Sequence, residues 1–280
     1  MPKGIVSFER RSLNNEEFPV WKDSNKTLKK LVVLKDGVIE DEGKGLLQVD
    51  FANKFIGGGV IGSGCVQEEI RFVICPELLI SRLFTEKLLD NEVIIICGSQ
   101  RFSTYSGYAN TFEWRGGYND DTPYDEWGRR MTRIVAMDAL YFNHSEVDIQ
   151  YERKYFEREL NKAFCAFLER RYSEPKNKCA IASGNWGCGA FNGDPLLKTI
   201  IQVMAASQVD RDLVLFTFND FILKQKIKNF YTFLTNNNFN VKHLYKGVLL
   251  YQNRLKYSGF DRKLDIFEFF MDSKEVILEN

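Results

Sequence analysis

The chain has 280 residues, of which 44% are hydrophobic and 14% aromatic, so it can form one large domain and does not resemble a disordered chain. Its 38 basic and 38 acidic side chains balance, which argues against a nucleic-acid-binding surface and means that a polyanionic ligand would need a pocket of backbone amides. Six scattered cysteines without a C-x-x-C pair, together with only two histidines, predict reduced thiols rather than disulfides or a zinc site.

The first thirty residues mix charges with isolated apolar side chains, and we predict an irregular lead-in ahead of the domain. They lack the long apolar core of a signal peptide, and no stretch of the sequence reaches 18 uninterrupted apolar residues. We therefore expect a soluble intracellular protein without membrane contact.

The segment from 31 to 151 alternates short apolar runs with helix signals. The runs predict strands at 31–34, 46–51, 93–97 and 134–137, and the signals predict helices at 66–74 and 76–87. Residues 100–128 are rich in Tyr, Gly and Asp, which predicts a long functional loop with a hairpin around 112–114.

The second half continues the alternation. An amphipathic helix is predicted at 151–168, a strand at 179–182 before a second glycine loop, and another strand at 213–218. Asp194 and Pro195 predict the N-cap and first residue of a helix to about 207, with further helices to near 251 and a solvated tail at 272–280. Strands alternating with helices predict a three-layer α/β domain over 31–271.

The first glycine loop runs from Gly57 to Gly64 and is followed by Gln67, Glu68 and Glu69. Glycines allow a close backbone approach, and their amides can hold an anion, so this loop is a candidate diphosphate cradle. Two carboxylates directly after such a cradle would repel a polyanion unless they had a chemical role. Apolar neighbours on both sides predict that at least one of them is partly buried.

Several sequence blocks resemble those of one family. The triple glycine followed after seven residues by Gln-Glu-Glu, together with VDFAN (49–53), SGYA (106–109), ASGNWGCGAF (182–191) and FTFND (216–220), is similar to the poly(ADP-ribose) glycohydrolases of the eukaryotic type. The resemblance implies a macrodomain-like α/β/α fold with a mixed central sheet, an ADP-ribose cleft, and hydrolysis of ribose–ribose bonds in the DNA damage response.

The resemblance also implies roles for individual residues. Glu69 would be the general acid/base, Glu68 would position the ribose, and Tyr108 would cover the substrate. Phe191 and Phe218 would form walls for the adenosine and ribose. The implied substrate contacts are Ile39, Glu40, Asp50, Asn53, Gly57, Gly58, Gly59, Gln67, Tyr108, Gly184, Asn185, Gly187, Gly189, Phe191 and Phe218.

The chemistry constrains Glu69. To protonate a leaving ribose oxygen it must carry a proton near neutral pH. Because adjacent helical residues diverge by about 100°, Glu68 and Glu69 are poorly placed to flank one sugar from both sides, so a single acid/base is expected. A non-catalytic ADP-ribose reader is the alternative, and a reader would not need Glu69.

A nucleotide enzyme of another kind ranks far behind, because the first loop lacks the G-K-[ST] ending and the G-x-G-x-x-G spacing. The expected partners are poly(ADP-ribose), ADP-ribose and poly-ADP-ribosylated proteins, with no direct nucleic-acid or membrane contact. We expect no metal and no cofactor, and a monomer in the nucleus or cytoplasm.

Overall fold

The computed structural model describes residues 4–169, 178–257 and 264–279. A mixed seven-stranded sheet in the order β1-β4-β7-β3-β8-β9-β2 forms its centre. Strands β1, β4 and β7 pair antiparallel, and the pairs from β7 through β3, β8 and β9 to β2 are parallel. The strands of this sheet are β1 Ser7–Ser12, β2 Leu31–Leu34, β3 Leu47–Asp50, β4 Glu92–Gly98, β7 Arg130–Ala136, β8 Ile181–Gly184 and β9 Leu213–Phe216.

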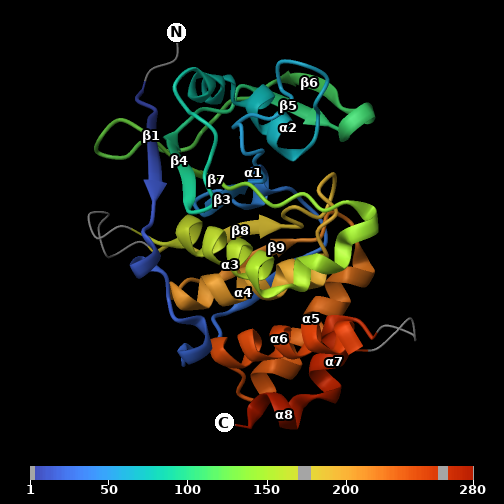
Figure 1. Ribbon diagram of the computed structural model, residues 1–280. Helices are drawn as coiled ribbons and strands as arrows, with labels where there is room; N and C mark the ends of the chain where they lie inside the picture. The colour runs from blue at the N-terminus through green and yellow to red at the C-terminus, as the bar shows by residue number, and fades with distance from the viewer. Residues whose placement is uncertain (1–3, 170–177, 258–263, 280) are drawn as a thin grey trace.

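Helices cover both faces of this sheet, which confirms the predicted α/β class (Figure 1). The α-helices are α1 Ile39–Glu42, α2 Gln67–Ile74, α3 Arg153–Phe167, α4 Pro195–Gln208, α5 Phe221–Asn236, α6 Val241–Tyr257, α7 Ile266–Asp272 and α8 Lys274–Leu278. The 3-10 helices are η1 Asn15–Glu17, η2 Trp21–Asp23, η3 Pro76–Leu83, η4 Ala109–Thr111 and η5 His144–Tyr151. The helix predicted at 76–87 begins at Pro76 but is a 3-10 helix that ends at Leu83.

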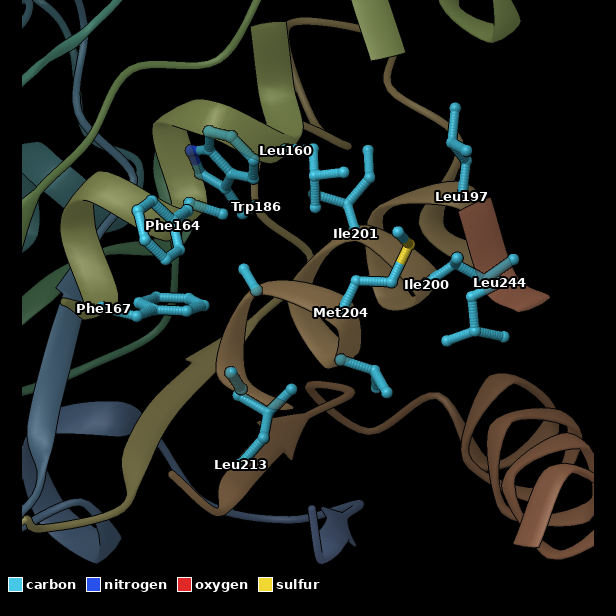
Figure 2. Packing of buried hydrophobic residues seen from close by; sticks show 14 of the residues in the cluster. Leu160, Phe164, Phe167, Trp186, Leu197, Ile200, Ile201, Met204, Leu213 and Leu244 are labelled. Atoms are coloured by element: carbon cyan, nitrogen blue, oxygen red, sulfur yellow. The ribbon is translucent and has the colours of Figure 1, made fainter. Parts of the chain in front are cut away.

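Alternation along β4 sorts its side chains between two cores. Val93 and Ile95 join the larger core, which α3, α4 and the C-terminal helices complete, whereas Ile94 and Ile96 join the smaller core under α2 and η3. Both faces of the strand are therefore buried, as its continuous apolar run predicts. Figure 2 shows the larger core, where Trp186 lies near Leu160 and Phe164 of α3.

The start of α4 follows its sequence signals. Asp194 Oδ1 accepts hydrogen bonds from the amides of Leu196 at 2.6 Å and Leu197 at 3.1 Å, and Pro195 occupies the first helical position. The predicted start of this helix is confirmed. Since α4 follows β8 and its loop, this cap also fixes where the second glycine loop ends.

The sequence prediction is wrong near both ends of the chain. Residues 7–12 are not an irregular lead-in but the edge strand β1, which pairs with β4 along its whole length. The charged residues of 9–11 hid this strand, because an edge strand can expose polar side chains. Residues 272–279 are not a solvated tail, since α8 buries Ile277 completely in the larger core. Three apolar residues, Val276, Ile277 and Leu278, in an otherwise polar segment were too weak a signal.

The predicted loop at 100–128 contains a small antiparallel sheet, in which β5 Ser103–Ser106 pairs with β6 Glu113–Gly117. The Arg101 amide donates a hydrogen bond to Asp120 Oδ2 at 2.8 Å, which joins the residues before β5 to those after β6. The turn between the strands therefore projects from a fixed base on the α2 side of the main sheet (Figure 1). None of the helices in the described ranges is long and apolar enough to cross a membrane.

Candidate active site

A cavity of about 870 Å³ opens at the carboxyl ends of the parallel strands β3, β8 and β9. Its walls come from α1, the start of α2, the turn after β5, and the loops after β8 and β9. Parallel strands bring such loops to one edge of the sheet, where α/β proteins bind ligands. Of the predicted contacts, the cavity is lined by Ile39, Glu40, Gln67, Tyr108, Asn185, Gly187, Gly189, Phe191 and Phe218.

The carboxylate of Glu68 is held by the backbone that leads into the first glycine loop. Its Oε2 accepts a hydrogen bond from the Asn53 amide at 2.8 Å, and its Oε1 accepts one from the Gly57 amide at 2.6 Å. Glu68 is only 2% exposed and is not among the residues that line the cavity. Its carboxylate is therefore fixed just behind the cavity wall.

Glu69 is held in the same way, one step further along the loop. Its Oε1 accepts from the Gly59 amide at 2.9 Å and its Oε2 accepts from the Val66 amide at 3.0 Å. Glu69 is 7% exposed and, like Glu68, is not among the residues that line the cavity, although its neighbours Val66 and Gln67 are. The prediction that at least one of the two carboxylates is buried is confirmed, and the structure buries both.

The three consecutive glycines of the first loop do not offer their amides to a ligand, and none of residues 57–64 lines the cavity. The amides of Gly57 and Gly59 bind the two glutamates, and that of Gly58 donates to the Phe55 carbonyl at 3.1 Å. The structure therefore does not place the predicted diphosphate cradle at these three glycines, because the anions that the amides of Gly57 and Gly59 hold are the protein's own carboxylates. The glycines are needed because a Cβ at Gly58 would lie 2.4 Å from Glu69 Oε1 and 2.8 Å from Glu68 Oε2.

Asp50 also departs from its predicted place. It is a buried residue at the end of β3, does not line the cavity, and lies with its carboxyl against that of Glu68. Within the described part of the chain neither Asp50 oxygen has a hydrogen-bond partner, although both are buried. Asp50 is thus a neighbour of a candidate catalytic residue and not a substrate contact.

Burial sets the protonation of this pair. Desolvation raises the pKa of Asp50 to about 7, against the opposing charge of Arg71. Desolvation, followed by the charge of Asp50, also raises the pKa of Glu68 well above its usual range, although two backbone amides oppose this shift. Burial therefore favours the protonated form of both carboxyls.

Three other predicted contacts have structural partners. Gln67 lines the cavity, but its side chain accepts from the Phe51 amide at 2.8 Å and donates to the Val49 carbonyl at 3.1 Å, which braces the end of β3. Asn53 accepts from the Phe55 amide through its side chain. Gly184 lies outside the cavity lining, beneath the Phe218 ring, where a Cβ would come within 2.7 Å of that ring.

Tyr108 forms an exposed lip of the cavity. It is 55% exposed, and Thr111 pins its backbone by accepting from the Tyr108 amide at 3.0 Å and donating to the Tyr108 carbonyl at 2.8 Å. Its phenol lies at the backbone of Gln67 and within the field of Glu69; desolvation, opposed by the Gln67 contact, raises the pKa of Tyr108. The ring can therefore contact a ligand beside Glu69.

The loop after β8 has the free amides that the first loop lacks. Within the ranges that the structure describes, the amides of Gly187, Gly189, Ala190 and Phe191 have no hydrogen-bond acceptor, and all four residues line the cavity. Gly187 has a φ of +75°, which turns the backbone toward the cavity. This loop can hold an anionic group.

Phe218 closes the cavity next to α1. Its backbone is left-handed, with a φ of +49°, and that of Asn219 follows at +69°. A bulky residue in this region is strained, and the Asn219 amide offsets the strain by donating to the Lys35 carbonyl at 2.8 Å. The ring packs edge-on against Phe51, with centroids 6.5 Å apart.

Several lining residues were not predicted, although all but Tyr105 adjoin a predicted one. The Tyr105 hydroxyl donates to the Glu40 carboxylate and so fixes one wall. The sequence signal that could have found them, apart from Tyr105, is that they belong to the same short blocks as the predicted residues. The further lining residues of this kind are Phe51, Ala52, Tyr105, Trp186, Cys188, Ala190 and Asn219.

Comparisons with known proteins agree with this geometry. The family profile described as "Poly (ADP-ribose) glycohydrolase (PARG), Macro domain fold" matches residues 18–225. The chain is 36% identical to poly(ADP-ribose) glycohydrolase 1 of Arabidopsis thaliana, across 76% of this chain and 50% of that one. It is 39% identical to poly(ADP-ribose) glycohydrolase 1 of Caenorhabditis elegans, across 81% of this chain and 30% of that one.

The chain thus spans half the length of the plant relative or less than a third of the nematode one. Among solved structures, a poly(ADP-ribose) glycohydrolase from Deinococcus radiodurans aligns over 81% of this chain and 94% of its own. Its sequence is 14% identical and the TM-score is 0.43, which is too low to support an argument. The family match covers most of the sheet, both glutamates and the cavity. The chain belongs to the poly(ADP-ribose) glycohydrolase family with the macrodomain fold.

Proposed function

We propose that the chain hydrolyses the ribose–ribose O-glycosidic bonds of poly(ADP-ribose) and releases ADP-ribose. The observation that carries this proposal is the placement of Glu68 and Glu69. Four backbone amides fix their carboxylates directly behind the wall of the cavity at Val66 and Gln67. A protein that only binds ADP-ribose has no need for two immobilised carboxylates at this point.

The cavity matches the ligand in size and lining. About 870 Å³ lies within the range of sites for drug-sized ligands, which ADP-ribose resembles in bulk. The free amides of the loop at 187–191 would bind the diphosphate, because they are the unused donors that face the cavity. Phe191 and Phe218 would flank the sugars, and Ile39 with Glu40 would meet the adenine at the α1 end.

Glu69 would act as the single acid/base. Each of its carboxylate oxygens uses one lone pair for a backbone amide and has a second that can carry a proton. In the forward step that proton passes to the 2′-oxygen of the leaving ribose as the bond to the anomeric carbon breaks. The carboxylate then takes a proton from a water molecule as its oxygen bonds to that carbon. Glu68, held behind the same wall, would position the ribose indirectly by fixing the backbone at Asn53 and Gly57.

Incubation of the purified chain with labelled poly(ADP-ribose), followed by separation of the products, tests this function. We expect ADP-ribose to accumulate as polymer disappears. If the polymer stays intact while calorimetry shows ADP-ribose binding, the chain is a reader of ADP-ribose and the enzymatic proposal is wrong. We further propose that polymer linked to proteins is a substrate, which polymer-bearing protein in the same assay would test.

A further inference from the structure

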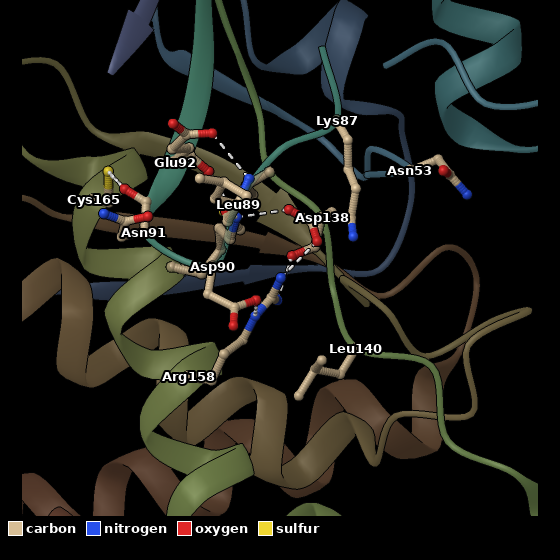
Figure 3. A network of polar contacts seen from close by, with 12 residues as sticks. Asn53, Lys87, Leu89, Asp90, Asn91, Glu92, Asp138, Leu140, Arg158 and Cys165 are labelled. Atoms are coloured by element: carbon tan, nitrogen blue, oxygen red, sulfur yellow. Dashed lines mark hydrogen bonds and ion pairs between the residues drawn. The ribbon is translucent and has the colours of Figure 1, made fainter. Parts of the chain in front are cut away.

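A cluster of buried charges lies under the loop that follows β8. Arg158 of α3 contacts Asp138 at 2.6 Å (Figure 3). Lys162 of the same helix also contacts Asp138, at 2.7 Å, and Arg158 contacts Glu159 at 2.6 Å. Lys198 of α4 contacts the second carboxylate oxygen of Glu159. Lys198 is 1% exposed and Lys162 is fully buried. Three cations therefore share two carboxylates inside the domain.

Such a cluster is costly to bury. Removing charges from water carries a desolvation penalty that ion pairs repay incompletely, and well-packed apolar side chains of similar volume often stabilise as well or better. Arg158 also reaches Asp90 at 3.0 Å, but the Asp90 side chain is 80% exposed, so solvent screens its charge. The free-energy cost of burying Lys198 is therefore better explained by a role in ligand binding than by a contribution to stability alone.

Lys198 lies directly beneath the backbone of the loop. Its ammonium is 3.9 Å from the centroid of the Trp186 ring, and a Cβ placed on Gly187 would lie 3.2 Å from Lys198 Nζ. Trp186 and Gly187 line the cavity on their other side, whereas Lys198 does not. The ammonium is thus separated from the cavity by about one layer of atoms and is shielded from water.

We propose that Lys198 is a positioning residue whose buried charge holds the diphosphate of the substrate against the free amides of Gly187 and Gly189. This inference rests on the proposed function, since it assumes a diphosphate at this loop. In a site of low dielectric constant, a charge a few ångströms below the amides adds to their attraction for an anion. Lys198 would act through the loop without touching the ligand.

The arrangement of the charges supports this role. Burial raises the pKa of the neighbouring Cys188 thiol to about 12, and among the charges that act on this thiol Lys198 acts more strongly than Asp194 or Glu159. Asp194 is moreover engaged by the first amides of α4 and by the Tyr151 hydroxyl at 2.6 Å. Lys198 is therefore the largest single charge that acts on this part of the loop.

Two substitutions that break the same ion pair distinguish this role from a structural one. Lys198→Met removes the cation beneath the loop, and Glu159→Gln removes the anion that offsets it. We expect calorimetry to show ADP-ribose binding at least about tenfold weaker in the first variant and tighter in the second, although both lose thermal stability. Weaker binding in both, or no change in Lys198→Met, would overturn the proposal.

The double variant Lys198→Met/Glu159→Gln keeps the test decisive if a single variant fails to fold, because it removes both members of the Lys198–Glu159 pair while Arg158 keeps its contact with Asp138. Its binding should fall between those of the two single variants, within about threefold of the unchanged chain. A larger loss in the folded double variant would show that Lys198 supports the loop by packing on Trp186, contrary to the proposal. If the unchanged chain does not bind ADP-ribose, the proposed ligand itself is wrong, and this inference falls with it.

Discussion

The Cα of Gly58 faces the carboxylate of Glu69 so closely that a Cβ there would lie 2.4 Å from Oε1. Gly58 also has a φ of +45°, which side-chain-bearing residues rarely adopt. The loop therefore wraps the two glutamates at a distance that only a glycine allows. This relationship makes the position of the carboxylates dependent on a residue that has no side chain of its own.

Substitution of Gly58 by alanine should therefore displace Glu69 and lower polymer hydrolysis by at least about 10²-fold, the lower range for loss of general acid–base catalysis. Gly45→Ala is the matched control, because Gly45 also has a positive φ, of +78°, but nothing lies within 4 Å of its Cβ position. The control should lose about 1–2 kcal/mol of stability and keep its rate. Equal rates in the two variants would contradict the role of the loop.

A second prediction concerns Asp50. Its pKa, raised by burial from 3.8 to about 7, means that the folded chain binds a proton between these values and the unfolded chain does not. This group therefore stabilises the fold at low pH, and its contribution is lost as pH rises through about 7. We expect Asp50→Asn to gain stability relative to the unchanged chain as pH rises from 4 to 7, by up to about 1.4 kcal/mol per pH unit.

Urea unfolding of both proteins across this pH range measures the effect. Asp50→Glu, which keeps a titratable group, is the control and should retain the pH dependence of the unchanged chain. A difference between the unchanged chain and Asp50→Asn that stays constant with pH would show that Asp50 is already ionised in the folded state.

A third prediction separates substrate contact from folding at Tyr108. Because the side chain is more than half exposed at the lip of the cavity, Tyr108→Ala should raise the KM for polymer while the melting temperature changes little. Phe72→Ala provides the contrast, since Phe72 is fully buried and its truncation should cost about 3–5 kcal/mol. If Tyr108→Ala loses as much stability as Phe72→Ala, Tyr108 is a structural residue.

The fourth prediction is that hydrolysis does not depend on a metal ion. The mechanism draws its proton from Glu69, and within residues 4–169, 178–257 and 264–279 no three His, Cys, Asp or Glu side chains are grouped to hold a metal. Rates measured before and after chelation should agree. Activity that is lost with the chelator and returns on adding a divalent ion would refute this.

The strands and helices with strong patterns could be predicted from the sequence. The apolar run at 93–97 and the Asp194-Pro195 cap lie where they were expected, because burial on both faces and capping are local effects. Strand β1 and helix α8 could not be predicted, since their residues become an edge strand and a core contact only through partners far away in the chain. Tertiary contacts decide such weakly patterned segments.

The candidate site, like the fold, could be predicted only in part from the sequence. The motifs predicted which segments meet at the cavity, and Tyr108, Asn185, Phe191 and Phe218 all line it. The motifs could not reveal that the Gly57 and Gly59 amides donate hydrogen bonds to Glu68 and Glu69. A glycine-rich segment can bind a carboxylate of the protein itself as well as an anionic ligand. The burial of Asp50 against Glu68 likewise depends on the register of β3 beside α2.

The most direct test of the central claim compares Glu69→Gln with Glu68→Gln in polymer hydrolysis and ADP-ribose binding. Glutamine keeps the volume of the side chain and one hydrogen-bond acceptor but cannot exchange the catalytic proton. We predict that Glu69→Gln lowers the rate by about 10²–10⁴-fold, more than Glu68→Gln does, while calorimetry shows ADP-ribose affinity unchanged or slightly higher. Full polymer hydrolysis by Glu69→Gln would contradict the account.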